Sequence, residues 1–319
     1  MLPIEPPQSA LMKFSPYKNR IVPYMKYRPH QREKKALSII GLVNLAQNGF
    51  LKIPSVVKAK KISLADCLMS ALAMFSLKSP SLLAFDEMRS EELVAHNLKH
   101  LYGIGNTPSD TYMREVLDEV DPKAIRKSFL SIFHEAQRGK LLEQYEFQGG
   151  YLCLLDGTEL FNSEKIHCKN CCKKEHKDGR VTYHHQMLGA VIAHPERRQV
   201  IPLCPEPILK QDGITKNDCE RNAFHRFLID LKREHPRLKL TICSDALSAT
   251  APHINELKDF GYRFIIVVKP VGNRSLYEFV TGITREIKMT VGKNKYIFRY
   301  ANNVPLNETK NTPNVNFLE

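Results

Sequence analysis

The chain has 319 residues and a formal net charge of +13, and 43% of its residues are hydrophobic and 25% charged. This composition is typical of a globular protein with a core, and the length allows about two domains. The longest apolar stretch, residues 64–77, contains Asp66 and falls short of the ~20 apolar residues that cross a bilayer, so we expect no membrane span. Most of the eight cysteines are scattered. Together with an amino end rich in proline and lysine, they argue against a secreted, disulfide-bonded protein and favour a soluble, cytoplasmic one.

The positive charge is concentrated at the amino end. Residues 1–61 hold twelve Lys and Arg and two acids, which gives +10 and leaves +3 for the rest of the chain. Residues 1–33 also carry six of the nineteen prolines, which predicts an extended basic arm. Such an arm favours a polyanionic partner, usually nucleic acid, although a solvated leader is the alternative.

Residues 34–145 carry helical periodicity. Apolar residues recur at helical spacing up to Gly49, and Ser63 has the position of an N-cap for a helix through Leu77. Further helices are predicted over residues 90–102, from Thr107 to Pro122, and over 123–143. We therefore expect an all-helical domain, which is the candidate DNA-binding domain.

The periodicity then alternates between strands and helices. Strands are predicted over residues 146–155, 182–193, 198–203, 239–243 and 264–268. Helices are predicted over residues 218–234 and 252–260, and from about Ser275. The order β-β-β-α-β-α-β-α predicts an α/β domain over residues 146–282, with a mixed sheet and helices on both faces. The β-like patterns over residues 286–291 and 295–301 set residues 283–319 apart as a further β-rich segment.

Two aspartates follow two of the predicted strands. Asp156 follows the apolar run 151–155, and Asp245 follows 240–244. If the first and fourth strands are neighbours, the carboxylates meet at one sheet edge, where a divalent cation would offset their repulsion. Mg²⁺ or Mn²⁺ at such a site acts on phosphodiesters. The alternative is that each aspartate caps a turn or a helix.

Three cysteines cluster between the first two predicted strands, at positions 168, 171 and 172. Cys168 and Cys171 have the Cys-x2-Cys spacing of zinc ligands, and His176 is a candidate third ligand. His184 and His185 are adjacent on a strand and point to opposite faces, so we expect core or surface roles for both.

A second interpretation of the cysteine segment is a basic loop that contacts DNA phosphates, because no matching second Cys-x2-Cys pair accompanies it. The candidate DNA-binding residues are Lys165, Lys169, Lys173, Lys174 and Arg180 in this loop, and Lys269 after the fifth strand.

Five segments carry a resemblance to a known family: residues 79–86, 155–158, 184–202, 218–222 and 243–246. Over residues 75–319 the chain resembles insertion-sequence transposases of the DDE type, close to the insertion-sequence-four group. The resemblance implies an RNase H-like fold. It also implies that Asp156 and Asp245 are the first two of three acidic ligands of the catalytic Mg²⁺ ions.

The third acid of that family is a Glu on a helix after a β-rich insertion. By resemblance, residues 283–319 are the start of this insertion, which implies a chain truncated before the Glu. The family's Tyr-x2-Arg-x3-Glu-x6-Lys pattern is matched in spacing by Tyr296, Arg299 and Lys310, but Asn303 replaces the Glu. We expect a strand and a turn there, since Pro305 would break a helix. Glu278, after the fifth strand, is another stand-in.

The resemblance implies a transposase that cleaves insertion-sequence ends and transfers the strands, and that is incomplete without its third acid. Its partners would be double-stranded DNA, both transposon ends and target, and a second copy in the DNA complex. A cytoplasmic, nucleoid-associated location follows. Two alternatives remain: a non-catalytic DNA-binding protein that inhibits transposition, and a metal-dependent nuclease using the two aspartates.

Overall fold

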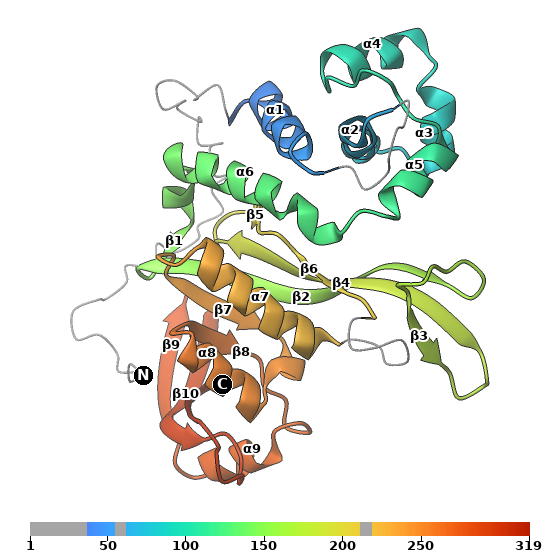
Figure 1. Cartoon of the computed structure of the whole chain (residues 1–319). Coiled ribbons are helices and arrows are strands. Elements are labelled where there is room, and N and C mark those ends of the chain that lie inside the picture. Colours follow the sequence, from blue (N-terminus) through green and yellow to red (C-terminus); the bar gives the residue numbers. More distant parts are fainter. Residues whose placement is uncertain (1–36, 55–61, 211–218) are drawn as a thin grey trace. The chain divides into compact units, whose positions relative to one another are not determined.

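The computed structural model describes residues 37–54, 62–210 and 219–319 (Figure 1). The predicted basic arm, 1–33, lies outside these residues. The described chain forms two compact units. The amino-terminal unit holds the residues up to Tyr151 and Gly157–Pro236, and the carboxy-terminal unit holds Leu152–Asp156 and Arg237–Glu319.

The amino-terminal unit begins with helices whose starts agree with the capping signals in the sequence. Ser63 accepts a hydrogen bond from the backbone N–H of Asp66 at 3.0 Å, which satisfies one free donor of the first turn. Gly103 adopts φ +65° just after the fourth helix, a conformation that favours glycine. The helices are α1 (Ile39–Phe50), α2 (Leu64–Ser76), α3 (Leu82–Met88), α4 (Glu92–His100), α5 (Asp110–Leu117) and α6 (Arg126–Arg138), with 3₁₀ turns η2 (Pro122–Ile125) and η3 (Leu141–Tyr145).

A compact apolar cluster joins the first helices to one another. Its buried members are Met69, Ala73, Phe85, Leu98 and Ile104. No helix within the described ranges combines the length and the apolar character needed to cross a bilayer. The predicted helical composition of residues 34–145 is thus observed over the described part of that range.

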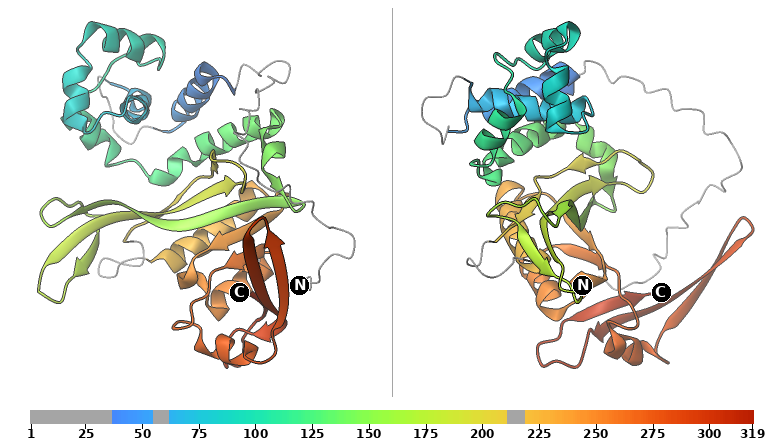
Figure 2. Two further views of the ribbon diagram at one scale, coloured as in Figure 1. Left: turned by 180° about the vertical axis from the view of Figure 1, so that it is seen from behind. Right: turned by 90° about the vertical axis from the view of Figure 1, so that its right-hand side faces the viewer.

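The amino-terminal unit continues with a set of strands that pair mainly antiparallel. Its elements are β1 (Glu146–Phe147), β2 (Gly150–Ser163), β3 (Cys172–Glu175), β4 (Val181–Ala193), β5 (Ile201–Pro202), β6 (Glu206–Ile208) and helix α7 (Glu220–Glu234). β4 pairs antiparallel with β3, β5 and β6, and β2 is its other neighbour. The two long strands β2 and β4 reach together towards the loop that leads to β3 (Figure 2).

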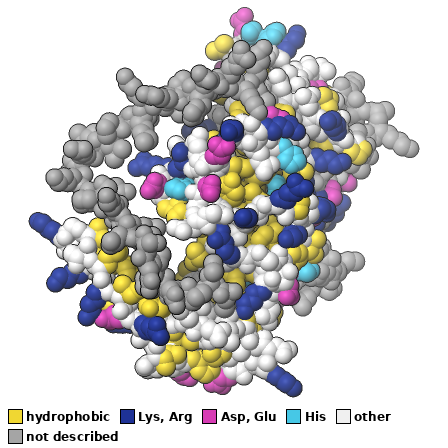
Figure 3. All heavy atoms as spheres, turned by 90° about the vertical axis from the view of Figure 1, so that its left-hand side faces the viewer, with side chains coloured by type: hydrophobic (Ala, Val, Ile, Leu, Met, Phe, Trp, Pro, Cys, Tyr) yellow, Lys and Arg dark blue, Asp and Glu magenta, His cyan; other side chains and the backbone are white. Residues whose placement is uncertain are grey.

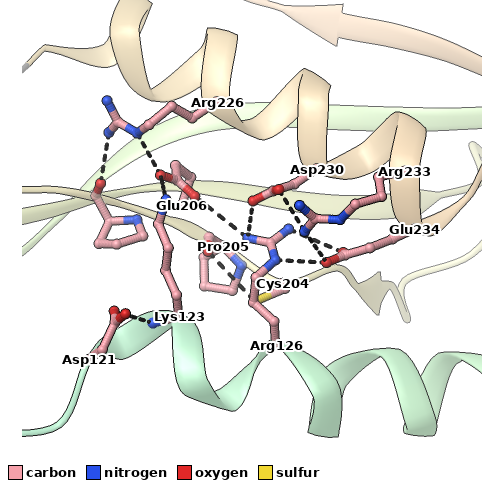
Figure 4. A network of polar contacts seen from close by, with 11 residues as sticks. Asp121, Lys123, Arg126, Cys204, Pro205, Glu206, Arg226, Asp230, Arg233 and Glu234 are labelled. Atoms are coloured by element: carbon pink, nitrogen blue, oxygen red, sulfur yellow. Dashed lines mark hydrogen bonds and ion pairs between the residues drawn. The ribbon is translucent and has the colours of Figure 1, made fainter.

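A buried network of charges links α6, β6 and α7 (Figure 4). Glu206 is fully buried, and its carboxylate lies 2.7 Å from Arg226 Nε and 3.3 Å from Lys123 Nζ. Arg126, 8% exposed, lies 3.5 Å from Glu206 and donates two hydrogen bonds to Glu234, at 2.8 and 3.1 Å. Buried charges are tolerated only when paired, so these three elements are held in one arrangement.

The carboxy-terminal unit places residues Leu152–Asp156 of β2 beside β7 (Leu240–Ser244), and β7 pairs parallel with β8 (Arg263–Ile266). Its other elements are the 3₁₀ turn η4 (Ala246–Ser248), helices α8 (Ala251–Asp259) and α9 (Arg274–Val280), and strands β9 (Arg285–Val291), β10 (Asn294–Pro305) and β11 (Asn314–Leu318). The last three strands form a separate antiparallel sheet in the order β11-β10-β9. β9 and β10 extend as a long ribbon (Figure 2).

The chain is therefore a mixed α/β protein with a mixed sheet, as predicted, but several strands differ from the expectation. β3, β6 and β11 were not predicted, and the strand predicted over residues 198–203 is reduced to the two residues of β5. The short β3 is ordered by its pairing with β4, a partner that local sequence does not identify. The strand predicted over residues 295–301 is observed within β10, but β10 continues to Pro305 through residues 302–303, where a turn was expected. Asn303 adopts φ +57° at an irregularity between Ala301 and Val304.

We predict that Arg126→Met destabilises the protein by about 3–5 kcal/mol, because it leaves buried carboxylates without their cation. The matched control is Arg138→Met on the exposed end of the same helix. Arg138 pairs with Glu135 near the surface, and such pairs contribute about 0–1 kcal/mol. Urea unfolding followed by circular dichroism measures both. Equal losses in the two variants would contradict a special role for the buried network.

His235 predicts a pH dependence of stability. Burial lowers the pKa of His235 to about 4, and its ring packs edge-on against Phe133 with centroids 4.3 Å apart. The unfolded pKa is ~6.5. As the pH falls below that value, His235 becomes protonated in the unfolded state but stays neutral in the folded state until about pH 4. The free energy of unfolding therefore decreases, by about 2 kcal/mol at pH 5.

His235→Gln should remove about that much of the stability difference between pH 7 and pH 5, whereas His100→Gln, at an exposed site on α4, should not. Urea midpoints at the two pH values provide the measurement. An unchanged difference in His235→Gln would show that another group titrates in this range. The lowered pKa of Glu234 has its effect at lower pH, because carboxylates in unfolded chains titrate near pH 4.3.

Candidate metal centres

Asp156 lies within β2 and not at its end. The sequence predicted a strand that stops at Leu155, whereas β2 continues to Ser163, so that prediction of the strand end was wrong. The polar residues after Asp156 remain extended because β4 supplies a long neighbouring strand. Asp156 is exposed, and Gly157 follows it.

Asp245 directly follows β7, where the sequence placed it. Its Oδ1 accepts a hydrogen bond from the backbone N–H of Leu247 at 3.0 Å and caps η4. The capping alternative therefore describes what Asp245 does in this structure. The cap occupies Oδ1, and the exposed carboxylate retains Oδ2 for another ligand.

The segments that carry the two aspartates are neighbours in the carboxy-terminal unit, because β2 and β7 are hydrogen-bonded partners. Cys153 on β2 and Cys243 on β7 are close enough to interact electrostatically. Burial raises the pKa of the Cys153 thiol strongly, and Cys243 raises it further. Asp156 is three residues beyond Cys153, and Asp245 is two residues beyond Cys243. The two strands are adjacent, as a paired-carboxylate site requires, but only Asp245 follows the end of its strand, since Asp156 lies within β2.

A third carboxylate does not complete a compact three-ligand group with these aspartates among the described residues. Glu278 is exposed on α9. Glu220, at the start of α7, is different. A Cβ atom added to Gly157 would lie 1.7 Å from Glu220 Oε1, so the Glu220 carboxylate lies directly against the residue that follows Asp156 in the chain. A larger residue at position 157 would require the flexible end of the Glu220 side chain to move. The sequence alone had suggested no more than surface pairing for Glu220.

The three-ligand group that the described residues do contain consists of Cys168, Cys171 and His185, whose donor atoms all lie within 4.8 Å of one another. The two sulfurs are 3.8 Å apart, and His185 Nε2 lies 3.3 Å from each. Cys171 is buried, Cys168 is exposed and His185 is partly buried. All three belong to the amino-terminal unit.

The structure thus brings together the two predicted cysteines but replaces His176 with His185. His176 Nε2 lies 3.0 Å from Thr182 Oγ1, at the other end of the β3–β4 pair. The expectation that His185 has only a core or surface role missed its position beside both sulfurs. The missing signal was the register, which pairs Cys172 with His184 and so carries the following His185 to the face where Cys171 lies.

Burial is the main cause of the pKa shifts of His185 and Cys171 in this cluster. Burial lowers the pKa of His185, against an opposing effect of Asp118, and so favours the neutral imidazole that ligates metals. Burial is also the largest of several effects that together raise the pKa of the Cys171 thiol.

Some of the predicted DNA-binding Lys and Arg residues form ion pairs with acidic residues, and others do not. Lys173 pairs with Glu175 at 2.8 Å, and Arg180 pairs with Asp178 at 2.7 Å. Lys169 lies 3.7 Å from Glu119, beyond the end of α5. Lys165 and Lys174 are exposed and have no ion pair within the described ranges. Lys269 is exposed in the carboxy-terminal unit.

No protein-family model matches this chain, and a search of curated proteins finds no match.

Proposed function

We propose that this chain acts on DNA as a DDE-type transposase, with Asp156 and Asp245 as two acidic ligands of a catalytic Mg²⁺ or Mn²⁺. The observation that carries the proposal is the adjacency of β2 and β7, the strands that bring the two exposed aspartates to the same unit. The proposal includes an RNase H-like arrangement of that sheet. The mixed sheet and the α7 helix between β6 and β7 are compatible with it.

Each aspartate would contribute at least one free oxygen. Asp245 retains Oδ2 while Oδ1 holds the N–H of Leu247, so the turn is kept in place during metal binding. Asp156 is exposed on a strand whose backbone is fixed by its neighbours. A bound divalent ion would activate water and stabilise the charge that develops on a phosphodiester.

DNA binding in this proposal is mainly electrostatic. The chain carries +13, and Lys and Arg side chains are spread widely over the face seen in Figure 3, with acidic side chains fewer among them. Lys165 and Lys174 are the freest of the predicted contacts, because the other cations of that segment have acidic partners. Phosphate contacts of this type fix position and not sequence.

The test measures binding and cleavage separately. Purified protein should bind duplex DNA with an affinity that falls steeply with salt, and Lys165→Gln with Lys174→Gln should reduce the salt slope by about 2. Cleavage in Mg²⁺ or Mn²⁺ should be weak, because no third acid among the described residues completes a compact three-ligand group with the two aspartates. Asp156→Asn and Asp245→Asn should abolish it without loss of binding.

The matched control is Asp259→Asn, at an exposed site on α8, which should bind and cut as the unmodified protein does. Asn at position 245 also keeps an acceptor for the N–H of Leu247, so a lost activity there is not a lost cap. Cleavage that persists in Asp156→Asn, or the absence of salt-sensitive binding, would overturn the proposal.

A further inference from the structure

We propose that Cys168, Cys171 and His185 bind one Zn²⁺ ion, which fixes the loop between β2 and β3 to strand β4. This inference stands apart from the proposed DNA chemistry, because it uses none of the same residues and its test needs no DNA. The cluster consists of two cysteines of this loop and His185 on β4, which lies 14 positions beyond Cys171 in the sequence.

The donor distances suit tetrahedral zinc. With Zn–S of ~2.3 Å and Zn–N of ~2.0–2.1 Å, a tetrahedral ion separates two sulfurs by about 3.8 Å and a sulfur from a nitrogen by about 3.5 Å. The corresponding distances here are 3.8 Å between the sulfurs and 3.3 Å from each sulfur to His185 Nε2. A small outward shift of the imidazole therefore makes room for the ion.

The loop backbone is already arranged to support thiolates. The backbone N–H of Cys168 donates to Cys171 Sγ at 3.3 Å, and the N–H of Asn170 donates to Cys168 Sγ at 3.4 Å. Cys171 N–H donates to the carbonyl oxygen of Cys168 at 3.2 Å and closes the turn. Such N–H groups stabilise the negative charge that each sulfur carries when it binds a metal.

Surrounding residues hold the loop over β4. The ring of His167 stacks on Tyr183 with centroids 4.2 Å apart, and Lys169 pairs with Glu119. Asp118, next to Glu119, acts electrostatically on His185. Three protein donors leave a fourth position for water.

The chemical type of the three donor atoms indicates which metal ions the cluster binds. Two sulfurs and one imidazole favour Zn²⁺ over Mg²⁺ or Ca²⁺, which bind oxygen. The neighbouring Cys172 is excluded because it starts β3 and its Sγ lies 3.7 Å from the carbonyl oxygen of Ile208. Cys172 and His176 therefore serve as matched controls of the same residue types within the same segment.

The test is metal content under reducing conditions. The full chain should retain about one zinc per molecule by elemental analysis, and replacement by Co²⁺ should give sulfur-to-cobalt charge-transfer absorption. Cys168→Ser, Cys171→Ser and His185→Asn should each weaken zinc affinity by on the order of 100-fold or more. Cys172→Ser and His176→Asn should retain the metal.

Circular dichroism of each variant separates ligand loss from misfolding, and Cys168→Ser carries the test most safely because Cys168 is exposed. Chelation should lower the melting temperature of the unmodified protein and leave that of Cys168→Ser unchanged. Absence of zinc and of cobalt absorption in the reduced protein would overturn the proposal. Full metal retention in His185→Asn would overturn the assignment of that ligand.

Discussion

The cost of burying Glu206 is the constraint on which the amino-terminal unit depends. A fully buried carboxylate is tolerated only beside cations, and three reach it from separate elements: Lys123 from η2, Arg126 from α6 and Arg226 from α7. Arg126 also contacts Asp230 and Glu234 on α7. The hydrogen bond and charges from these acids outweigh the effect of burial and raise the pKa of Arg126.

Local signals in the sequence predicted the helices well. Ser63 and Ser109 cap α2 and α5 where the chain changes from extended to helical, and Gly103 ends the α4 region. These signals are reliable because a cap acts on donors within three residues of itself. Strands β7 and β8 were also predicted, since each contains a short apolar run bounded by turn residues.

Long-range pairing set the limit of prediction. β2 continues past Asp156, and β3 exists, because β4 offers a partner along most of its length; the polar residues 156–163 contain no local strand signal. The same dependence decided the cysteine site. The Cys-x2-Cys spacing predicted two donors, but the choice of His185 over His176 follows from the β3–β4 register. At Asp245 the two roles considered from the sequence are compatible with each other. Oδ1 caps the turn η4, and Oδ2 remains available to a metal ion.

The distribution of thiols makes the chain suitable for selective chemical labelling. Cys168 and Cys219 are exposed, whereas Cys153 and Cys204 are buried. Burial raises the pKa of Cys204 to about 11 and that of Cys153 further still. Maleimide and iodoacetamide reagents react with thiolates at accessible positions, so they should discriminate strongly between these two groups. Two fluorophores could therefore be placed in the loop between β2 and β3 and at the start of α7 without any engineered cysteine. A metal held by Cys168 would reduce the pattern to a single label at Cys219.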